Sequence, residues 1–186
     1  MIGPHASREA RDKAETMTSN PHRTAVFTGT FDPMTLGHLD VIGRGRLLFE
    51  RLVVGIGINP NKESLFTIEE RVELARLVVG PYPNVSVEAF EGLTVHYVRQ
   101  IGARVILRGL RTLSDMEYEF SMTMTNHRLD PEVETVFLMA DGEYSHVSSS
   151  LIKQVARFGK EDALRRFVPP ELVGPVMRKI RESHPD

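Results

Sequence analysis

The stretch TAVFTGTFDPMTLGH, residues 24–38, joins a short apolar run to a turn and the start of a helix. Its first five residues are rich in β-branched and aromatic side chains and predict a strand. Gly29 and Pro33 end that strand, and Thr35 is a favourable N-cap for the helix that follows. We expect a helix over about 38–50, although Gly43 and Gly45 each weaken a helix interior by up to about 1 kcal/mol relative to alanine.

The same alternation of strand and helix continues along the chain. Helix-length stretches follow at about 67–79, 93–101 and 114–127, and the first begins with a T-x-x-E capping box at Thr67 and Glu70. Apolar runs predict four further strands, at 52–58, 85–90, 104–107 and 133–139.

The pattern after residue 148 is helical, and Pro169-Pro170 marks the start of the last helix. Alternating strands and helices predict an α/β fold. We expect a doubly wound, mainly parallel five-stranded Rossmann-like sheet with helices on both faces and a helical C-terminus. Residues 1–23 are polar and carry no periodic apolar face, so we interpret them as a disordered extension and 24–186 as a single domain.

Composition excludes several classes of function. Lys and Arg total 23 against 25 Asp and Glu, which argues against a general nucleic-acid or membrane-surface binder. The chain has no cysteine, so disulfides and thiolate metal sites are excluded. No apolar run approaches the ~18 residues of a membrane span. We therefore expect a cytoplasmic protein.

Residues suited to chemistry follow the predicted strands, where parallel sheets bind their ligands. The first such segment ends in T-x-G-H, at residues 35–38. A helix N-terminus attracts phosphate, Gly37 permits close backbone approach, and His38 can donate to a phosphate oxygen. An ordinary helix cap with an incidental histidine explains the same four residues about equally well.

Arg108 and Arg111 flank a glycine in RGLR, and the acidic segment DMEYE follows at 115–119. Forked guanidinium groups suit phosphate recognition, although ion pairing is the commoner fate of surface arginines. On a helix, Asp115 and Glu119 share one face, and a metal-binding carboxylate cluster is only weakly supported.

Ser148, Ser149 and Ser150 precede an amphipathic run. A helix cap explains one of these serines, and three in succession suggest an anion-binding helix start. Met116, Met122 and Met124 are more typical of packing residues than of a cofactor site.

These motifs carry a family resemblance. GTFDPMTLGHLD (29–40) resembles the T/H-x-G-H signature of the nucleotidyltransferase superfamily. Together with Asn61-Lys62, FTIEERVELAR (66–76), RGLR, DMEYE, VFLM (136–139) and SSSLIKQVARFG (148–159), it is similar to the bacterial phosphopantetheine adenylyltransferase family. The resemblance runs from about residue 24 to 180.

The resemblance implies AMP transfer from ATP to 4′-phosphopantetheine, with Mg²⁺ accompanying ATP and a homo-hexameric assembly. It implies catalytic roles for Thr30, His38, Lys62 and Arg108. It places the acceptor against Thr30, Lys62, Thr94 and Arg108. It assigns ATP to Thr30, Phe31, His38, Gly109, Leu110, Arg111, Glu119, Tyr144, Ser145, His146, Val147, Ser148, Ser149 and Ser150.

Four positions depart from the family pattern. Thr28 stands where the family usually has proline, Leu36 where asparagine is frequent, and Tyr144 and His146 where Trp and Phe occur. These changes bear on contacts to the nucleotide rather than on the reaction. Two alternatives stay open: an adenylyltransferase or cytidylyltransferase acting on another phosphate acceptor, and a non-catalytic nucleotide-binding module.

Overall fold

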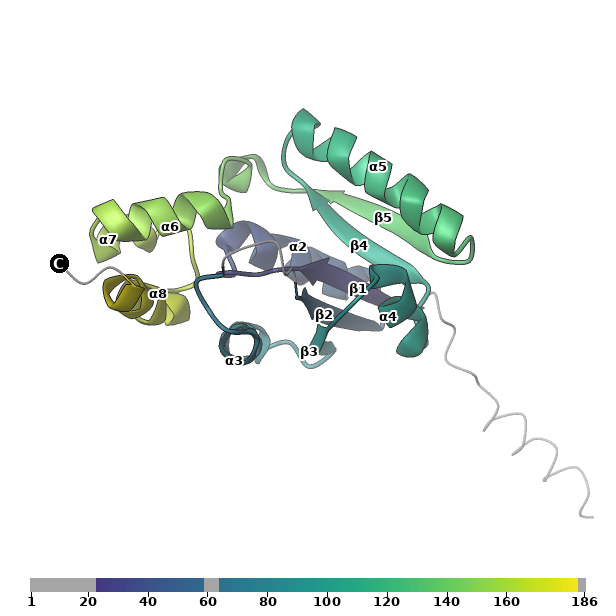
Figure 1. The fold of residues 1–186 in the computed structure, drawn as a ribbon, viewed down its shortest axis with the longest axis horizontal. Coiled ribbons are helices and arrows are strands. Elements are labelled where there is room, and N and C mark those ends of the chain that lie inside the picture. The colour runs from purple at the N-terminus through teal and green to yellow at the C-terminus, as the bar shows by residue number, and fades with distance from the viewer. Residues whose placement is uncertain (1–22, 59–63, 184–186) are drawn as a thin grey trace, which may run out of the picture.

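The computed structural model of the protein describes residues 23–58 and 64–183. Five strands alternate with helices along the chain (Figure 1). The elements are β1 (Thr24–Gly29), α2 (Leu36–Leu48), β2 (Arg51–Gly57), α3 (Ile68–Val79), β3 (Val85–Phe90), α4 (Thr94–Gln100), β4 (Val105–Leu110), α5 (Leu113–Leu129), β5 (Glu134–Met139), the 3₁₀ turn η2 (Gly142–Tyr144), α6 (Ser149–Phe158), α7 (Glu161–Leu164) and α8 (Pro170–Ser183).

The strands form one parallel sheet in the order β3-β2-β1-β4-β5. The chain therefore starts in the middle, winds out to β3, returns past β1 and winds out to β5. This is a doubly wound sheet, and its topology reverses between β1 and β4. The fold class predicted from the alternating pattern is confirmed.

Helices cover both faces of the sheet because alternate strand residues point to opposite sides. On one face, Ala25 and Phe27 of β1 join the core that includes α2 and α3. On the other face, Val26 joins a second core built with α4. Central strands buried on both sides explain the uninterrupted apolar runs in the sequence.

The predicted strand boundaries are nearly right, with one consequential error. We placed Arg108 and Gly109 after the fourth strand, but β4 continues to Leu110. Arg108 pairs in register with Phe137 and Gly109 with Leu138 of β5. The sheet thus extends into the RGLR motif, because β4 and β5 keep pairing beyond the apolar part of the strand, and Arg108 is fixed on a rigid element.

Helix α2 is continuous despite its glycines, and Gly45 shows why one of them is there. A Cβ added at Gly45 would lie 2.5 Å from Cδ2 of Leu107 in β4. Gly45 therefore lets α2 pack closely against β4.

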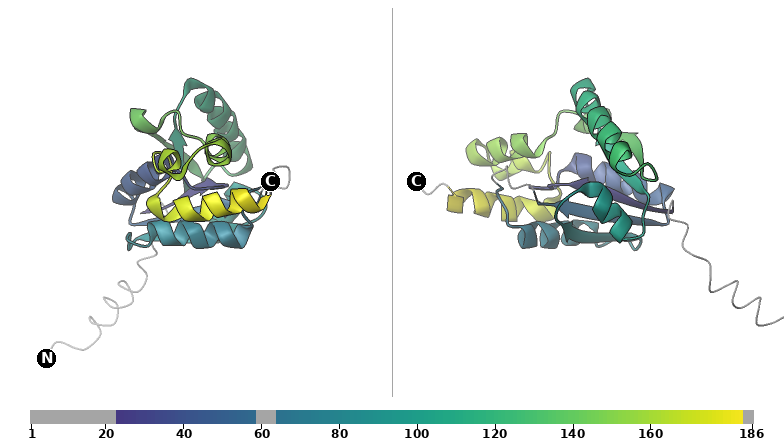
Figure 2. Two further views of the ribbon diagram at one scale, coloured as in Figure 1. Left: turned by 90° about the vertical axis from the view of Figure 1, so that its left-hand side faces the viewer. Right: turned by 45° about the vertical axis from the view of Figure 1, so that its right-hand side comes forward.

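The C-terminal helices form a group of their own, seen together on the left of Figure 1. Helix α8 lies alongside α3 (Figure 2), and a Lys179–Glu70 ion pair of 2.6 Å joins them. Backbone from this group reaches the site as well, since the N–H of Leu36 donates to the carbonyl of Phe167 at 2.9 Å. Within the described ranges, no helix is long and apolar enough to cross a membrane.

Candidate active site

A pocket of about 560 Å³ opens at the carboxyl ends of the strands, at the point where the topology reverses. Its wall combines the loop after β1, the ends of β2 and β4, the first turn of α4, one face of α5 and the start of α6. Segments up to about 120 residues apart in the chain therefore share one site.

His38 serves as the third residue of a capping box at the start of α2. Thr35 is the N-cap, and its Oγ1 accepts from the backbone N–H of His38 at 3.3 Å. In return, the backbone N–H of Thr35 donates to Nδ1 of His38 at 3.0 Å. The imidazole thus takes the place that Glu or Gln holds in the usual capping box. The T-x-G-H motif is a helix cap, and the cap orients the histidine in the pocket.

This hydrogen bond fixes the tautomer of the imidazole. Because Nδ1 accepts from a backbone N–H, the ring proton of neutral His38 must lie on Nε2. Burial, and to a smaller extent the charges of Arg111 and Arg108, together lower the pKa of His38 to about 4. At neutral pH His38 is therefore an uncharged hydrogen-bond donor.

The loop before this helix holds an unusual backbone conformation. Phe31 has φ 45°, in the left-handed region that non-glycine residues rarely adopt. Its buried ring packs edge-on against His38, with ring centroids 5.0 Å apart, and also against Phe27. Phe31 packs against the imidazole of His38 but does not line the pocket itself.

All three guanidinium nitrogens of Arg108 form hydrogen bonds at the pocket wall. Its Nε donates to Oε2 of Glu119 at 2.8 Å, and its Nη2 contacts the other carboxylate oxygen. Its Nη1 donates to the carbonyl of Thr28 and to Oγ1 of Thr28, the latter at 3.1 Å. Glu119 is the buried residue of α5, so this ion pair also anchors α5 to the sheet.

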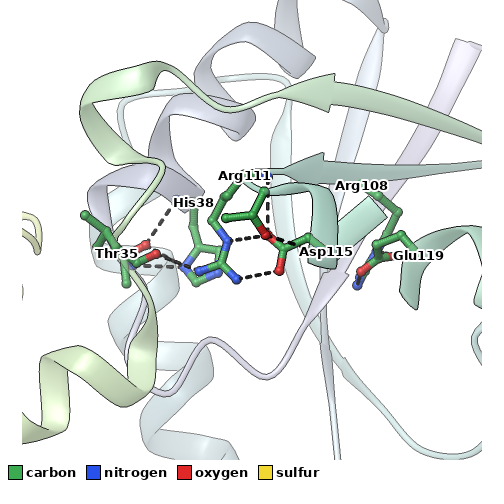
Figure 3. A network of polar contacts seen from close by, with 8 residues as sticks. Thr35, His38, Arg108, Arg111, Asp115 and Glu119 are labelled. Carbon is green, nitrogen blue, oxygen red and sulfur yellow. Dashed lines mark hydrogen bonds and ion pairs between the residues drawn. The ribbon is translucent and has the colours of Figure 1, made fainter. Parts of the chain in front are cut away.

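Arg111 lies between His38 and Asp115 in Figure 3. Its Nε and Nη2 donate to the two carboxylate oxygens of Asp115 at 2.9 and 3.1 Å. Its Nη1 donates to the carbonyl of Val147 at 2.7 Å and thereby connects α5 to the segment before α6. Both RGLR arginines form ion pairs and both line the pocket, while phosphate recognition by them stays a prediction.

The serines at the start of α6 form different hydrogen bonds. Ser148 is the N-cap, with its hydroxyl accepting from the N–H of Leu151. The hydroxyl of Ser149 donates to the carbonyl of Pro33 at 2.9 Å, which ties α6 to the loop after β1. All three line the pocket, where the free N–H groups of the first helical turn favour an anion.

Most of the predicted site residues meet in this pocket. Those that line it are Thr30, His38, Thr94, Arg108, Gly109, Arg111, Glu119, Val147, Ser148, Ser149 and Ser150. Leu110 points into the interior, Tyr144 packs its Cβ near Gly37, and Ser145 and His146 belong to the neighbouring turn rather than to the wall. Lys62 lies outside the described residues.

Sequence reasoning missed several residues that shape the site. Thr28 was noted only as a departure, yet its hydroxyl accepts from Arg108. Arg71, buried in α3, donates to the carbonyls of Thr30 and Gly57 and so joins the ends of β1 and β2. Asp32 binds two distant segments. In the sequence, Arg71 is recognisable as a charged residue in an amphipathic helix and Asp32 as a charged residue in a short motif. The groups that they bind lie far away in the sequence, so their roles could not be predicted.

Comparisons with known proteins agree with this geometry. Residues 26–155 match the Cytidylyltransferase-like family. A phosphopantetheine adenylyltransferase from Rhodopirellula baltica is 51% identical over 160 residues, covering 86% of this chain and 89% of the relative. The chain belongs to the phosphopantetheine adenylyltransferase family. Further members from Desulforudis audaxviator and Caldanaerobacter subterraneus subsp. tengcongensis are 49% and 46% identical, covering 95% and 99% of those relatives.

Solved structures support the fold at greater distance. Two structures of Plasmodium falciparum nicotinic acid mononucleotide adenylyltransferase, complexed with NaAD and with APC, superpose with a TM-score of 0.59 each. They are 10% and 12% identical, and each alignment covers 86% of this chain and 95% or 94% of the other. At this identity the likeness concerns the fold alone.

The described part of the chain does not build a Mg²⁺ site of its own. No group of three or more His, Asp or Glu side chains there is arranged to hold a metal. Both carboxylates in the pocket wall, Asp115 and Glu119, are already paired with arginines.

Proposed function

We propose that this protein transfers the AMP part of ATP to 4′-phosphopantetheine, giving dephospho-coenzyme A and pyrophosphate. The observation that carries the proposal is the capped, neutral His38 in one pocket with Arg108, Arg111 and the first turn of α6. That arrangement presents donors and positive charge to phosphates, which adenylyl transfer requires.

The reaction is an in-line displacement at phosphorus. A phosphate oxygen of the acceptor attacks the α-phosphorus of ATP and forms the new P–O bond. The bond from the α-phosphorus to the bridging oxygen breaks, and pyrophosphate leaves with that electron pair. Such transfer needs positioning and charge stabilisation more than covalent help from the protein.

His38 stabilises the charge that develops during transfer. Its Nδ1 is held by the Thr35 N–H, so Nε2 is the donor available to a phosphate oxygen. A neutral donor held in place costs little reorganisation as charge accumulates. Arg111, whose guanidinium lies beside His38, and the N–H groups of α6 support the triphosphate.

The acceptor occupies the side of the pocket formed by Thr30, Thr94 and Arg108. Arg108 holds most of its hydrogen-bond donors on Glu119 and Thr28, so it contributes one remaining Nη2 hydrogen and its partly neutralised charge. Lys62 follows β2 in the sequence and completes the acceptor contacts in this proposal. Mg²⁺ enters with ATP as part of the substrate.

We also propose that the protein assembles, with a homo-hexamer as the expected state. Large apolar side chains on α5 and the edge strand β5 are exposed, which is unusual for a monomer. This α5–β5 apolar face comprises Leu113, Met116, Phe120 and Met124, which recur at three- and four-residue spacing on α5, and Phe137 and Met139 of β5. We interpreted Met116, Met122 and Met124 as packing residues; within this chain they are exposed at 45%, 38% and 55%, because α5 turns its polar Glu119 inward. The cytoplasmic location stays a prediction from composition.

The test is pyrophosphate release from ATP with a panel of phosphate acceptors. We expect release with 4′-phosphopantetheine and at most background release with nicotinate mononucleotide or glycerol phosphate. Pyrophosphate release with another acceptor alone would identify the protein as a nucleotidyltransferase that acts on that acceptor. Release with none, together with retained ATP binding, would favour the non-catalytic module.

A further inference from the structure

Asp32 is a buried carboxylate that connects three separate segments next to the pocket. The residue is only 4% exposed, and it does not line the cavity. Its Oδ2 accepts from the N–H of Leu65 at 2.8 Å, and its Oδ1 accepts from the N–H of Phe66 at 2.9 Å. Its Oδ2 also accepts from Nζ of Lys153 in α6 at 2.6 Å. The proposed reaction assigns no role to the ion pair between Asp32 and Lys153.

Lys153 attaches α6 at a second point on the same helical face. Ser149 and Lys153 are four residues apart, so both point toward the loop after β1. Ser149 donates to the carbonyl of Pro33, and Lys153 binds the carboxylate of Asp32. Helix α6 is therefore docked onto two consecutive residues, 32 and 33, through its first two turns.

The docked loop is also the one with the unusual backbone. Phe31 directly precedes Asp32 and holds φ 45°, a conformation that costs about 1–3 kcal/mol and persists only when neighbours enforce it. The three hydrogen bonds to Asp32 provide such enforcement. They keep Phe31 against His38 on one side and hold the serines of α6 at the pocket wall on the other.

We propose that the Asp32–Lys153 ion pair is a positioning element that sets the affinity of the pocket for the triphosphate of ATP. It holds the N-terminus of α6 at a fixed place relative to the imidazole of His38. Both members act through the groups they position, and neither touches substrate. The inference rests on the proposed function of the pocket as an ATP site.

The matched pair of variants is Lys153→Met and Lys179→Met. Each removes a lysine from an ion pair of the same 2.6 Å length, but Lys179 joins α8 to α3, makes no hydrogen bond to Asp32 and does not line the pocket. Binding of a non-hydrolysable ATP analogue is measured by calorimetry on the full chain, well below the unfolding temperature of each variant. Steady-state KM for ATP and kcat are measured beside it.

We expect Lys153→Met to raise the Kd for the analogue and the KM for ATP roughly tenfold, with a smaller change in kcat. Lys179→Met should change both by less than about twofold, even where thermal unfolding shows an equal loss of stability. Lys153→Arg, which keeps the cation, should restore most of the affinity.

Two results would overturn the proposal. Unchanged Kd and KM in a folded Lys153→Met protein would show that the ion pair is only structural. Equal loss of affinity in both variants would show a general effect of stability. Failure of the proposed function is separate, because it would appear as absence of dephospho-coenzyme A formation by the unmodified protein.

Discussion

At the scale of single residues, the T-x-G-H motif gains its chemistry from a structural role. Thr35 caps α2 and, through its N–H, fixes Nδ1 of His38 as an acceptor. The helix cap that the sequence left open is present, and the role of His38 as a phosphate donor belongs to the proposed function. The cap selects the tautomer, and the tautomer leaves Nε2–H for substrate.

Replacing His38 with alanine should therefore lower kcat by roughly 10²–10³, the usual effect of removing one positioned donor to a developing charge. The Kd for ATP should change by less than about threefold, because other groups hold the triphosphate. Glu70→Ala is the matched control, since Glu70 fills the same third position in the capping box of α3. Near-normal turnover in the His38→Ala protein would contradict the assignment.

The lowered pKa of His38 also predicts how stability depends on pH. Its pKa falls from 6.5 in the unfolded chain to about 4 in the folded protein. Between these values the unfolded state binds the additional proton, so acidification from pH 6.5 to 4 destabilises the fold, by up to about 3 kcal/mol.

His38→Gln provides the reference, because glutamine keeps a capping box and does not titrate. The free energy of unfolding of the unmodified protein, measured in urea, should fall relative to this variant as the pH drops through that window. Parallel curves for the two proteins would show that the pKa of His38 is not lowered.

The pair formed by Arg108 and Glu119 yields a prediction about stability. Their side chains are 25% and 10% exposed, so removing one partner leaves a largely buried charge. Arg108→Met should cost about 3–5 kcal/mol, and adding Glu119→Gln should recover part of that loss. Chemical denaturation of the single and double variants measures the coupling, and strictly additive losses would show that the pair is not coupled.

At the scale of elements, the glycines of α2 separate local preference from packing. Gly43 faces open space apart from the hydroxyl of Tyr82, 3.7 Å from an added Cβ, whereas Gly45 is pressed against Leu107. Gly43→Ala should stabilise the protein by up to about 1 kcal/mol.

Gly45→Ala should destabilise it by about 1–3 kcal/mol through overpacking. Thermal unfolding of the two variants checks both signs, and a stabilising Gly45→Ala would show that α2 can move away from the sheet without cost.

Local patterns predicted the elements well because each depends on neighbours in sequence. The capping box at Thr67 and Glu70 and the apolar strands were recognisable in this way. The C-terminal extension of β4 was not, because its pairing partner is β5. Asp32 and Lys153 are 121 residues apart, so no local pattern joins them. The family resemblance pointed to many of the residues that line the pocket, although Phe31, Leu110 and Tyr144 lie outside its wall, and only the fold reveals the residues that hold the wall in place.

At the scale of the whole molecule, the topology explains why residues from distant segments line one pocket. The reversal of strand order between β1 and β4 separates the loops that follow them. Residues from both halves of the sheet then converge, with His38 contributed by the loop-and-helix after β1 and Arg108 by β4. The helices after β5 close the remaining side with the first turn of α6.

The exposed α5–β5 apolar face predicts that assembly depends on it. Phe120 belongs to this face and is 62% exposed, and a charge there should disfavour burial against another copy. Phe120→Glu should lower the molar mass in sedimentation equilibrium, whereas Phe158→Glu, at an 81% exposed position on α6, should leave it unchanged. An unchanged mass for the Phe120 variant would contradict the assignment of this face.

The central claim is tested most directly by ³¹P NMR of a mixture of ATP, 4′-phosphopantetheine and Mg²⁺ with the unmodified protein and with His38→Ala at equal ATP saturation. We predict that the unmodified protein converts the acceptor monophosphate signal into the pyrophosphate-diester signals of dephospho-coenzyme A, and that the variant does so at least about 100-fold more slowly. Equal rates of diester formation in the two samples, or none in either, would contradict the account.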